Sequence, residues 1–190
     1  MQDYHITRKL HQQKFGGRKL DKCKRHLKYW VEHRCIFQHD AEYLDLPINT
    51  KSTIAIDFSP NGQYLASTHG DHTVKITQFS TRKTIQTLEG HPRTPWTVKY
   101  HPKDNYIVAS GCLGFEVRVW DTKRGVCLHI ALCHHAIISM SFHPMGSCIA
   151  IASGATLFLW DFTDEYAAPI EAWNHSQALR CVKFMPSGRQ

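Results

Sequence analysis

The sequence lacks the long apolar runs and paired cysteines that mark membrane and secreted proteins. None of its 190 residues lies in a run approaching the roughly 18 apolar residues of a membrane-spanning helix, and Met1–His5 lacks the apolar stretch of a secretory signal. Its seven cysteines form an odd set without a Cys-x-x-Cys pair, which favours reduced thiols. We therefore expect a protein of the cytoplasm or the nucleus, without a membrane span.

Catalytic and metal-binding motifs are missing as well. The chain has no Gly-x-Ser-x-Gly, P-loop or His-Glu-x-x-His pattern. Among its fourteen histidines, His134 and His135 come nearest to a cluster, because Cys127 and Cys133 precede them. Neighbouring residues of a strand point to opposite faces, so these two histidines would hardly bind one ion. We expect no enzyme activity, no metal and no cofactor.

Charge is unevenly distributed along the chain. The net charge of +7 belongs entirely to residues 1–34, which contain ten lysines and arginines against three acidic residues. The remaining residues carry thirteen basic and thirteen acidic side chains. A function that depends on positive charge is therefore expected of the N-terminal arm.

One phrase recurs four times at a constant interval. An aromatic residue stands two places before a proline, and the prolines lie 42 residues apart at Pro60, Pro102, Pro144 and Pro186. A period of about 40 to 45 residues is typical of the four-stranded blades of a β-propeller. We expect an all-β fold with blades at about residues 52–90, 91–133 and 134–175, and the start of a fourth at 176–190.

A second pattern is a Trp-Asp dipeptide at the end of the third expected strand. It occurs in two repeats, as Trp120-Asp121 and Trp160-Asp161. Gly90-His91 opens the second repeat. On these residues the chain resembles the WD-repeat family. The resemblance implies a buried hydrogen-bonded set of His91, Ser110 and Trp120, without the usual aspartate because Gly114 stands at its position.

The number of repeats is too small for a closed ring. A propeller needs about 4 to 8 blades, because an open one leaves sheet edges and an apolar face uncovered. We expect the remaining blades to come from later sequence or from another subunit, and the chain to be a fragment of such a ring.

Residues 1–50 contain no repeat and are expected to form a helical arm. An apolar stripe at helical spacing predicts a helix over about residues 18–34, with Leu20, Cys23, Leu27, Trp30 and Val31 on one face. A shorter helix is expected over Ile6–Phe15, before a hinge at Gly16-Gly17. The stripe fits packing against the blades, docking on another protein, or a calmodulin-like or anionic-membrane target.

Several stretches resemble the Ambra-type proteins (activating molecule in Beclin-regulated autophagy). They include Leu65–His69, the insertion Arg93-Thr94-Pro95-Trp96 after Gly90-His91, and Ala109–Leu113. This resemblance implies a substrate receptor of a cullin-4 RING ubiquitin ligase, with a propeller split by a long insertion and with Beclin-type autophagy partners. It also implies that the damaged-DNA-binding adaptor is bound by an arm helix, with apolar contacts from Leu20, Leu27, Trp30 and Val31 and charge contacts from Lys24 and Arg25.

Two further expectations concern ligands. Substrate proteins would contact propeller loops through side chains such as Arg93, Trp96 and Phe115. As an alternative from another class, the basic arm with Tyr4, Phe15 and Trp30 could bind RNA by neutralising phosphates and stacking bases. Against this alternative, the repeats are electrically neutral and contain no base-reading motif.

Overall fold

The structure, a computed structural model, describes residues 25–34, 43–164 and 166–188. The chain divides into two compact units, Met1–Tyr43 and Leu44–Gln190. In the first unit, residues 25–34 form an α-helix, the part of the predicted arm helix that falls within the described residues. Three predicted features lie outside them: the segment Ile6–Phe15, the hinge Gly16-Gly17, and the residues Leu20, Cys23 and Lys24 of the helix.

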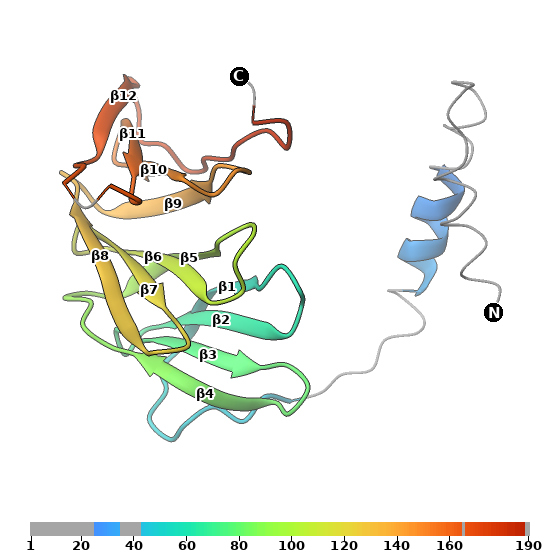
Figure 1. Cartoon of the computed structure of the whole chain (residues 1–190). Helices are drawn as coiled ribbons and strands as arrows, with labels where there is room; N and C mark the ends of the chain where they lie inside the picture. The colour runs from blue at the N-terminus through green and yellow to red at the C-terminus, as the bar shows by residue number, and fades with distance from the viewer. Residues whose placement is uncertain (1–24, 35–42, 165, 189–190) are drawn as a thin grey trace. The chain divides into compact units, whose positions relative to one another are not determined.

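The second unit confirms the predicted all-β fold. Among the described residues, twelve strands form three antiparallel sheets of four strands, each in chain order (Figure 1). We call these sheets blades 1 to 3. Blade 1 contains β1 (Thr53–Phe58), β2 (Tyr64–His69), β3 (Val74–Gln78) and β4 (Lys83–Leu88); blade 2 contains β5 (Pro95–Tyr100), β6 (Ile107–Cys112), β7 (Glu116–Asp121) and β8 (Val126–Leu132); blade 3 contains β9 (Ile137–Phe142), β10 (Cys148–Ser153), β11 (Thr156–Asp161) and β12 (Ile170–Asn174).

The repeated proline phrase forms the turn after the first strand of a blade. In blade 1 the Gly62 N–H donates to the Ser59 carbonyl at 2.8 Å, and in blade 3 the Gly146 N–H donates to the His143 carbonyl at 2.8 Å. Both glycines have a positive φ, 69° and 97°, a conformation that glycine adopts without steric cost. The turn predicted from the sequence is therefore present, and it sets the boundary between strands.

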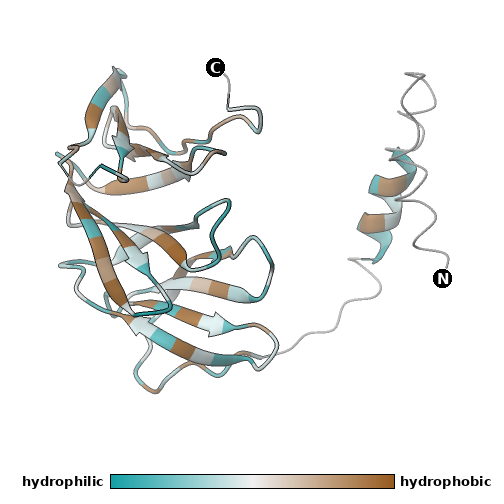
Figure 2. Cartoon of the chain, in the orientation of Figure 1, coloured by the Kyte–Doolittle hydropathy of each residue, from teal (hydrophilic) through white to brown (hydrophobic). Residues whose placement is uncertain are grey.

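The cores lie between neighbouring blades. One apolar cluster joins blade 1 to blade 2 and contains Ala66, Val74, Ile76, Leu88, Val98, Tyr100, Val108 and Trp120. A second joins blade 2 to blade 3, with Val117 and Val119 packed against Ile149, Ile151 and Phe158. Figure 2 shows the hydrophobic residues concentrated on the strands, as expected for sheets that pack against one another.

Hydrogen bonds also connect the first strands of successive blades. The Asp57 carboxylate of β1 accepts the Tyr100 N–H of β5 at 2.7 Å. In the same way, the Ser141 hydroxyl of β9 accepts the Phe184 N–H at 3.2 Å, and the Ser139 hydroxyl accepts the Val182 N–H at 3.1 Å. Residues 182–184 thus lie against β9 as β5 lies against β1, although the described residues 175–188 form no strand.

Residues just before blade 1 lie with the blades. Asp45 forms a parallel β-bridge with Lys83 of β4, and the Lys51 carbonyl contacts the His69 ring at 3.2 Å. Residues 44–50 were expected to belong to the arm, whereas the division between the two units falls between Tyr43 and Leu44.

We predict that Asp57→Ala lowers the free energy of unfolding by about 1 to 3 kcal/mol, because it leaves the buried Tyr100 N–H without an acceptor. Asp57→Asn keeps an acceptor oxygen and should cost clearly less. Urea denaturation of the three proteins measures this difference, and equal losses in the two variants would contradict the bridging role.

Candidate functional site

The described part of the arm is an amphipathic helix. Leu27 and Trp30 are partly buried, whereas Val31 is 44% exposed. Lys28 pairs with Glu32 at 3.7 Å, and the Arg34 guanidinium lies 5.0 Å from the centre of the Trp30 ring. The helix therefore places Leu27, Trp30 and Val31 at the i, i+3 and i+4 positions of one apolar face, as predicted.

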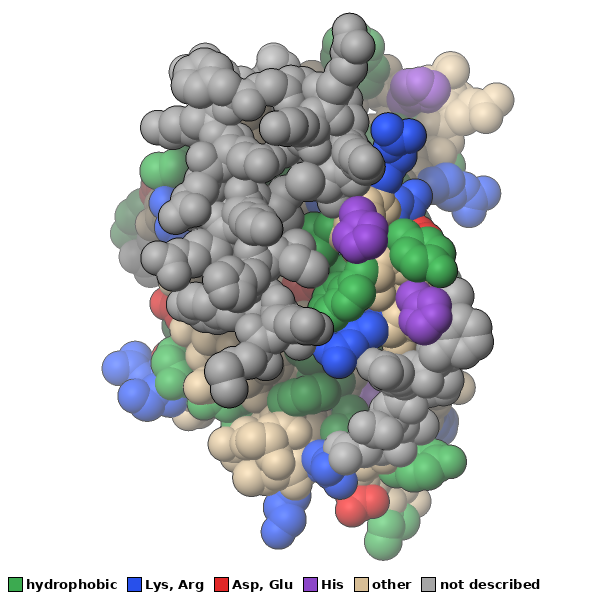
Figure 3. Space-filling model, turned by 90° about the vertical axis from the view of Figure 1, so that its right-hand side faces the viewer, with side chains coloured by type: hydrophobic (Ala, Val, Ile, Leu, Met, Phe, Trp, Pro, Cys, Tyr) green, Lys and Arg blue, Asp and Glu red, His purple; other side chains and the backbone are tan. Residues whose placement is uncertain are grey.

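Basic groups surround this apolar face in the sequence. In the space-filling view of Figure 3, lysine, arginine and histidine side chains are prominent on the visible described surface, and acidic ones are few. Of the predicted adaptor-binding residues, Arg25, Leu27, Trp30 and Val31 lie on the helix, while Leu20 and Lys24 lie outside the described residues. Their binding role stays a prediction.

The predicted substrate-contacting loops of blade 2 lie next to each other. The Leu113 N–H donates to the Thr94 carbonyl at 3.0 Å, which joins the loop before β5 to the turn between β6 and β7. Trp96 is 42% exposed and Phe115 46% exposed, so each offers an aromatic surface to solvent. Phe115 has a φ of 72°, which is uncommon and strained for an aromatic residue.

The predicted buried set of blade 2 is present. The Ser110 hydroxyl accepts the Trp120 indole N–H at 2.7 Å and forms a second hydrogen bond, 2.6 Å long, with Nε2 of His91. All three residues are buried. Nδ1 of His91 has no hydrogen-bond partner among the described residues, as expected from the missing aspartate. Burial, together with the nearby positive charge of Arg118, lowers the pKa of His91 to about 3.

Steric crowding explains the glycine at the aspartate position. A Cβ atom on Gly114 would lie 2.8 Å from Cγ of Pro92, closer than real Cβ contacts. Pro92 belongs to the loop that carries Arg93. Pro92, which directly precedes the insertion Arg93–Trp96, thus occupies the space that a side chain at position 114 would need.

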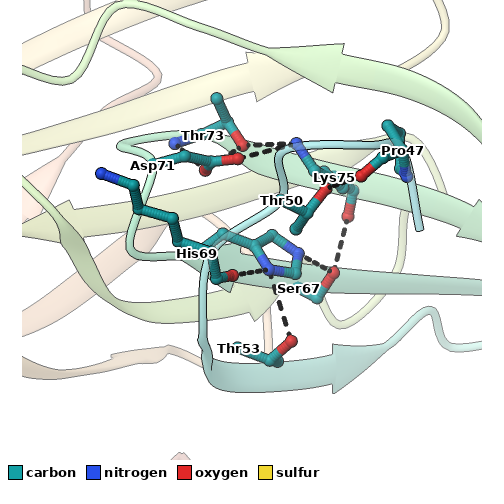
Figure 4. Close-up of polar contacts among 9 residues, drawn as sticks. Pro47, Thr50, Thr53, Ser67, His69, Asp71, Thr73 and Lys75 are labelled. Atoms are coloured by element: carbon teal, nitrogen blue, oxygen red, sulfur yellow. Dashed lines mark hydrogen bonds and ion pairs between the residues drawn. The ribbon is translucent and has the colours of Figure 1, made fainter.

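Blade 1 contains a different polar network at the corresponding place, which was not predicted from the sequence. Here Ser67 occupies the position of Ser110, and its hydroxyl lies 2.8 Å from Nε2 of His69, a histidine of the same strand (Figure 4). Nδ1 of this histidine contacts the Thr53 hydroxyl at 3.3 Å. The sequence contained a signal for this network, because His69 follows Ser67 by two residues and alternate residues of a strand point to the same face.

A buried ion pair lies beside this network. The Lys75 ammonium is 3.3 Å from the Asp71 carboxylate and 2.8 Å from the Thr73 hydroxyl. Burial alone would raise the pKa of Asp71, but hydrogen bonds from Thr73 and the Lys75 charge lower it. Blade 2 has a corresponding pair in Arg118 and Glu116, 2.9 Å apart. In both blades the charges are paired and therefore serve structure.

The Trp-Asp dipeptides close the turn after the third strand. Asp121 accepts the N–H groups of Lys123 at 2.9 Å and Arg124 at 3.1 Å, and Asp161 accepts the Thr163 N–H at 3.0 Å. The Trp160 indole N–H donates to the Ala167 carbonyl at 2.9 Å. These hydrogen bonds stabilise the turns that follow β7 and β11 within blades 2 and 3.

Within residues 25–34, 43–164 and 166–188, no group of three or more His, Cys, Asp or Glu side chains could hold a metal ion. In the same part of the chain, no helix has the length and apolar character needed to cross a membrane.

We predict that the blades lose stability as the pH falls from about 6.5 toward 3. His91 takes up a proton near pH 6.5 when unfolded but only near pH 3 when folded, so acid favours the unfolded chain between these values. The His91→Gln variant should show a smaller fall in the free energy of unfolding over this range. Identical pH profiles in urea denaturation would contradict the buried neutral histidine.

We also predict that Gly114→Ala destabilises the fold by about 1 to 3 kcal/mol, because the new Cβ collides with Pro92. Combining it with Pro92→Ala should recover part of this loss. Urea denaturation of the two single variants and the double variant measures the coupling, and strictly additive losses would argue against the collision.

Comparison with known proteins places the chain in a family. The family model described as WD domain, G-beta repeat, matches residues 46–77, 82–121 and 125–161. Activating molecule in BECN1-regulated autophagy protein 1B of Danio rerio is 38% identical over 149 residues, which cover 78% of this chain and 11% of that protein. Protein 1A of the same species is 35% identical with the same coverage. Pre-mRNA-processing factor 19 of Mus musculus is 25% identical over 141 residues, 71% of this chain and 27% of that protein.

The chain thus spans 11% of the length of the two autophagy relatives. The matched ranges of the family model cover more than half of the chain and fall on the strands of all three blades. This chain therefore belongs to the WD domain, G-beta repeat family, and its repeats are of the kind found in the activating molecules in BECN1-regulated autophagy.

Proposed function

We propose that the chain is a non-catalytic scaffold and acts as a substrate receptor of a cullin-4 RING ubiquitin ligase. In this proposal the arm helix docks on the damaged-DNA-binding adaptor, and the blades hold substrate proteins. The observation that carries the proposal is the helix over residues 25–34, with an apolar face of Leu27, Trp30 and Val31 in a strongly basic segment. An apolar face bordered by charge is a common way for a helix to bind a groove of another protein.

The loops of blade 2 support the substrate-holding part of the proposal. Trp96 and Phe115 expose aromatic rings on a rigid sheet, and Arg93 lies in the adjoining loop. Aromatic and arginine side chains contribute most strongly to protein interfaces. We propose that substrate proteins contact these three residues.

Blade 1 supports a partnership with further blades, from later sequence or another subunit. Ile56 and Phe58 pair with Ser67 and Leu65, on the face of the sheet opposite to Ala66, which packs toward blade 2. Both side chains are about half exposed. An additional blade would cover them, as blade 2 covers the other face.

The two relatives from Danio rerio support a role in autophagy. Those proteins are activating molecules in BECN1-regulated autophagy. We propose that this chain serves the same process with Beclin-type partners, in the cytoplasm or the nucleus.

A second candidate function, binding of RNA, is favoured by one observation. All of the net charge of +7 belongs to residues 1–34. Binding driven by phosphates weakens steeply between low and physiological salt, whereas docking of an apolar helix face changes little. A salt titration with generic RNA separates the two candidates, and strong salt-dependent RNA binding would favour the second.

We predict that Leu27→Asp combined with Trp30→Ala abolishes recovery of the ligase adaptor from cells, because it removes the apolar face of the helix. Tyr29→Ala is the matched control, since Tyr29 lies on another side of the helix and is highly exposed. Circular dichroism should show folded blades in all variants. Unaltered recovery of the adaptor with the double variant would refute the docking role.

A further inference from the structure

The outer strand of blade 2 is unusually apolar. The strand β8 reads Val-Cys-Leu-His-Ile-Ala-Leu, and Figure 2 shows its ribbon as hydrophobic except for one hydrophilic band. Ile130 is 52% exposed and Leu132 is 69% exposed. They pair with Arg118 and Glu116 of β7, which places both on one face of the sheet. Exposed apolar side chains in such a row indicate a surface that another chain covers.

This strand also has a free edge. The sheet order β5-β6-β7-β8 puts β8 at the border of blade 2, where one side of its backbone has no neighbouring strand among the described elements. A long apolar edge strand is a ready template for pairing with an extended chain. Native proteins usually protect such edges with charge, proline or a covering segment, and β8 contains no lysine, arginine or proline.

Blade 1 provides the comparison within the same molecule. Its outer strand β4 reads Lys-Thr-Ile-Gln-Thr-Leu, and it carries Thr87 opposite Lys75, where blade 2 carries Ile130 opposite Arg118. The edge of β4 is paired with Asp45 through a parallel bridge to Lys83. An extended segment therefore already pairs with the outer strand of one blade.

A groove lies along the corresponding edge of β8. It has a volume of about 320 Å³ and is lined by Ile130, Ala131 and Leu132 on one side and by Tyr166, Ala167, Ala168 and Pro169 on the other. Tyr166 is almost fully exposed at its border. The groove thus combines an open strand edge with an apolar wall.

The charge around the groove is negative. From Gly125 to Leu179 the sequence has no lysine or arginine, and its acidic residues in this stretch are Asp161, Asp164, Glu165 and Glu171. The Glu171 carboxylate lies 3.5 Å from the His134 ring, two residues beyond the end of β8, and remains about half exposed. A segment that binds the groove would therefore gain from positive charge at its ends.

We propose that β8 binds an extended, basic segment of a partner protein as a fifth strand of blade 2. Apolar side chains at alternate positions of the segment contact Ile130 and Leu132, and a lysine or arginine faces Glu171. The groove is lined by β8 and by Tyr166–Pro169, and Arg93, Trp96 and Phe115 are not among its lining residues. It gives the scaffold a further site, for an unstructured tail of a second protein.

The test uses the full chain and a dye-labelled synthetic peptide with alternating valines and a lysine at each end. Fluorescence anisotropy should show binding that is weakened about tenfold or more by Ile130→Lys, because the exposed apolar contact at the centre of the groove is lost. The matched control is Ile85→Lys, since Ile85 is 48% exposed on β4 and should not affect binding. A peptide with a central proline should bind the unchanged chain at least about tenfold more weakly, because proline cannot donate to the strand ladder.

Each other result would overturn the proposal. Equal binding of the proline peptide would exclude strand addition, and equal losses with Ile85→Lys and Ile130→Lys would exclude β8 as the site. A peptide with glutamate in place of lysine that binds as well would exclude a basic partner. Self-association of the chain, abolished by Ile130→Lys without any peptide binding, would assign the groove to a second copy.

Discussion

The fold depends on the packing of each sheet against the next one. Val98 and Val108 of blade 2 cover Ala66 and Ile76 of blade 1, and the opposite face of blade 2 covers the apolar strands of blade 3. Burial of apolar surface contributes about 25 cal/mol per Å², so the packing of neighbouring blades stabilises each of them. Hydrogen bonds such as that from Tyr100 to Asp57 fix the spacing of the first strands within this packing. The loops at the ends of the strands can differ in sequence because they contribute little to it.

Features that are encoded locally could be predicted from the sequence. The strands and turns of three blades follow from the 42-residue period and from the turn residues after each proline, which include a glycine in blades 1 and 3. The pairing of His91, Ser110 and Trp120 followed from the family resemblance.

Two features could not be predicted, because they depend on contacts in space. The sequence shows that Gly114 lacks a carboxylate, but the collision with Pro92 that excludes a side chain there becomes visible only in the structure. His69 was missed because it approaches Ser67 from the same strand and not from the preceding loop.

The fourth repeat also shows the difference between what the local sequence encodes and what depends on contacts in space. The phrase from Val182 matches the other copies, and its backbone is bound by Ser139 and Ser141 in the corresponding place. Residues 182–184 are nevertheless not a strand, since a strand requires a hydrogen-bonded neighbour on its other side. The local pattern specifies the position of this segment against β9, and the described residues include no strand that pairs with it. The binding roles predicted for the arm helix and the loops likewise depend on the partner protein as well as on this sequence.

Phe115 links the exposed turn between β6 and β7 to the end of β8. Its backbone is bent into the left-handed region, its N–H bonds to the Cys112 carbonyl at 3.3 Å, and its own carbonyl accepts the Cys133 N–H at 2.9 Å. The ring is therefore presented from a main chain whose rotations are already restricted on both sides. A molecule that binds this ring meets an ordered surface, so little conformational entropy remains to be lost on association. Replacement of Phe115 by glycine would remove the ring and also give the backbone at this position more conformational freedom, so that a preorganised contact would become a flexible loop.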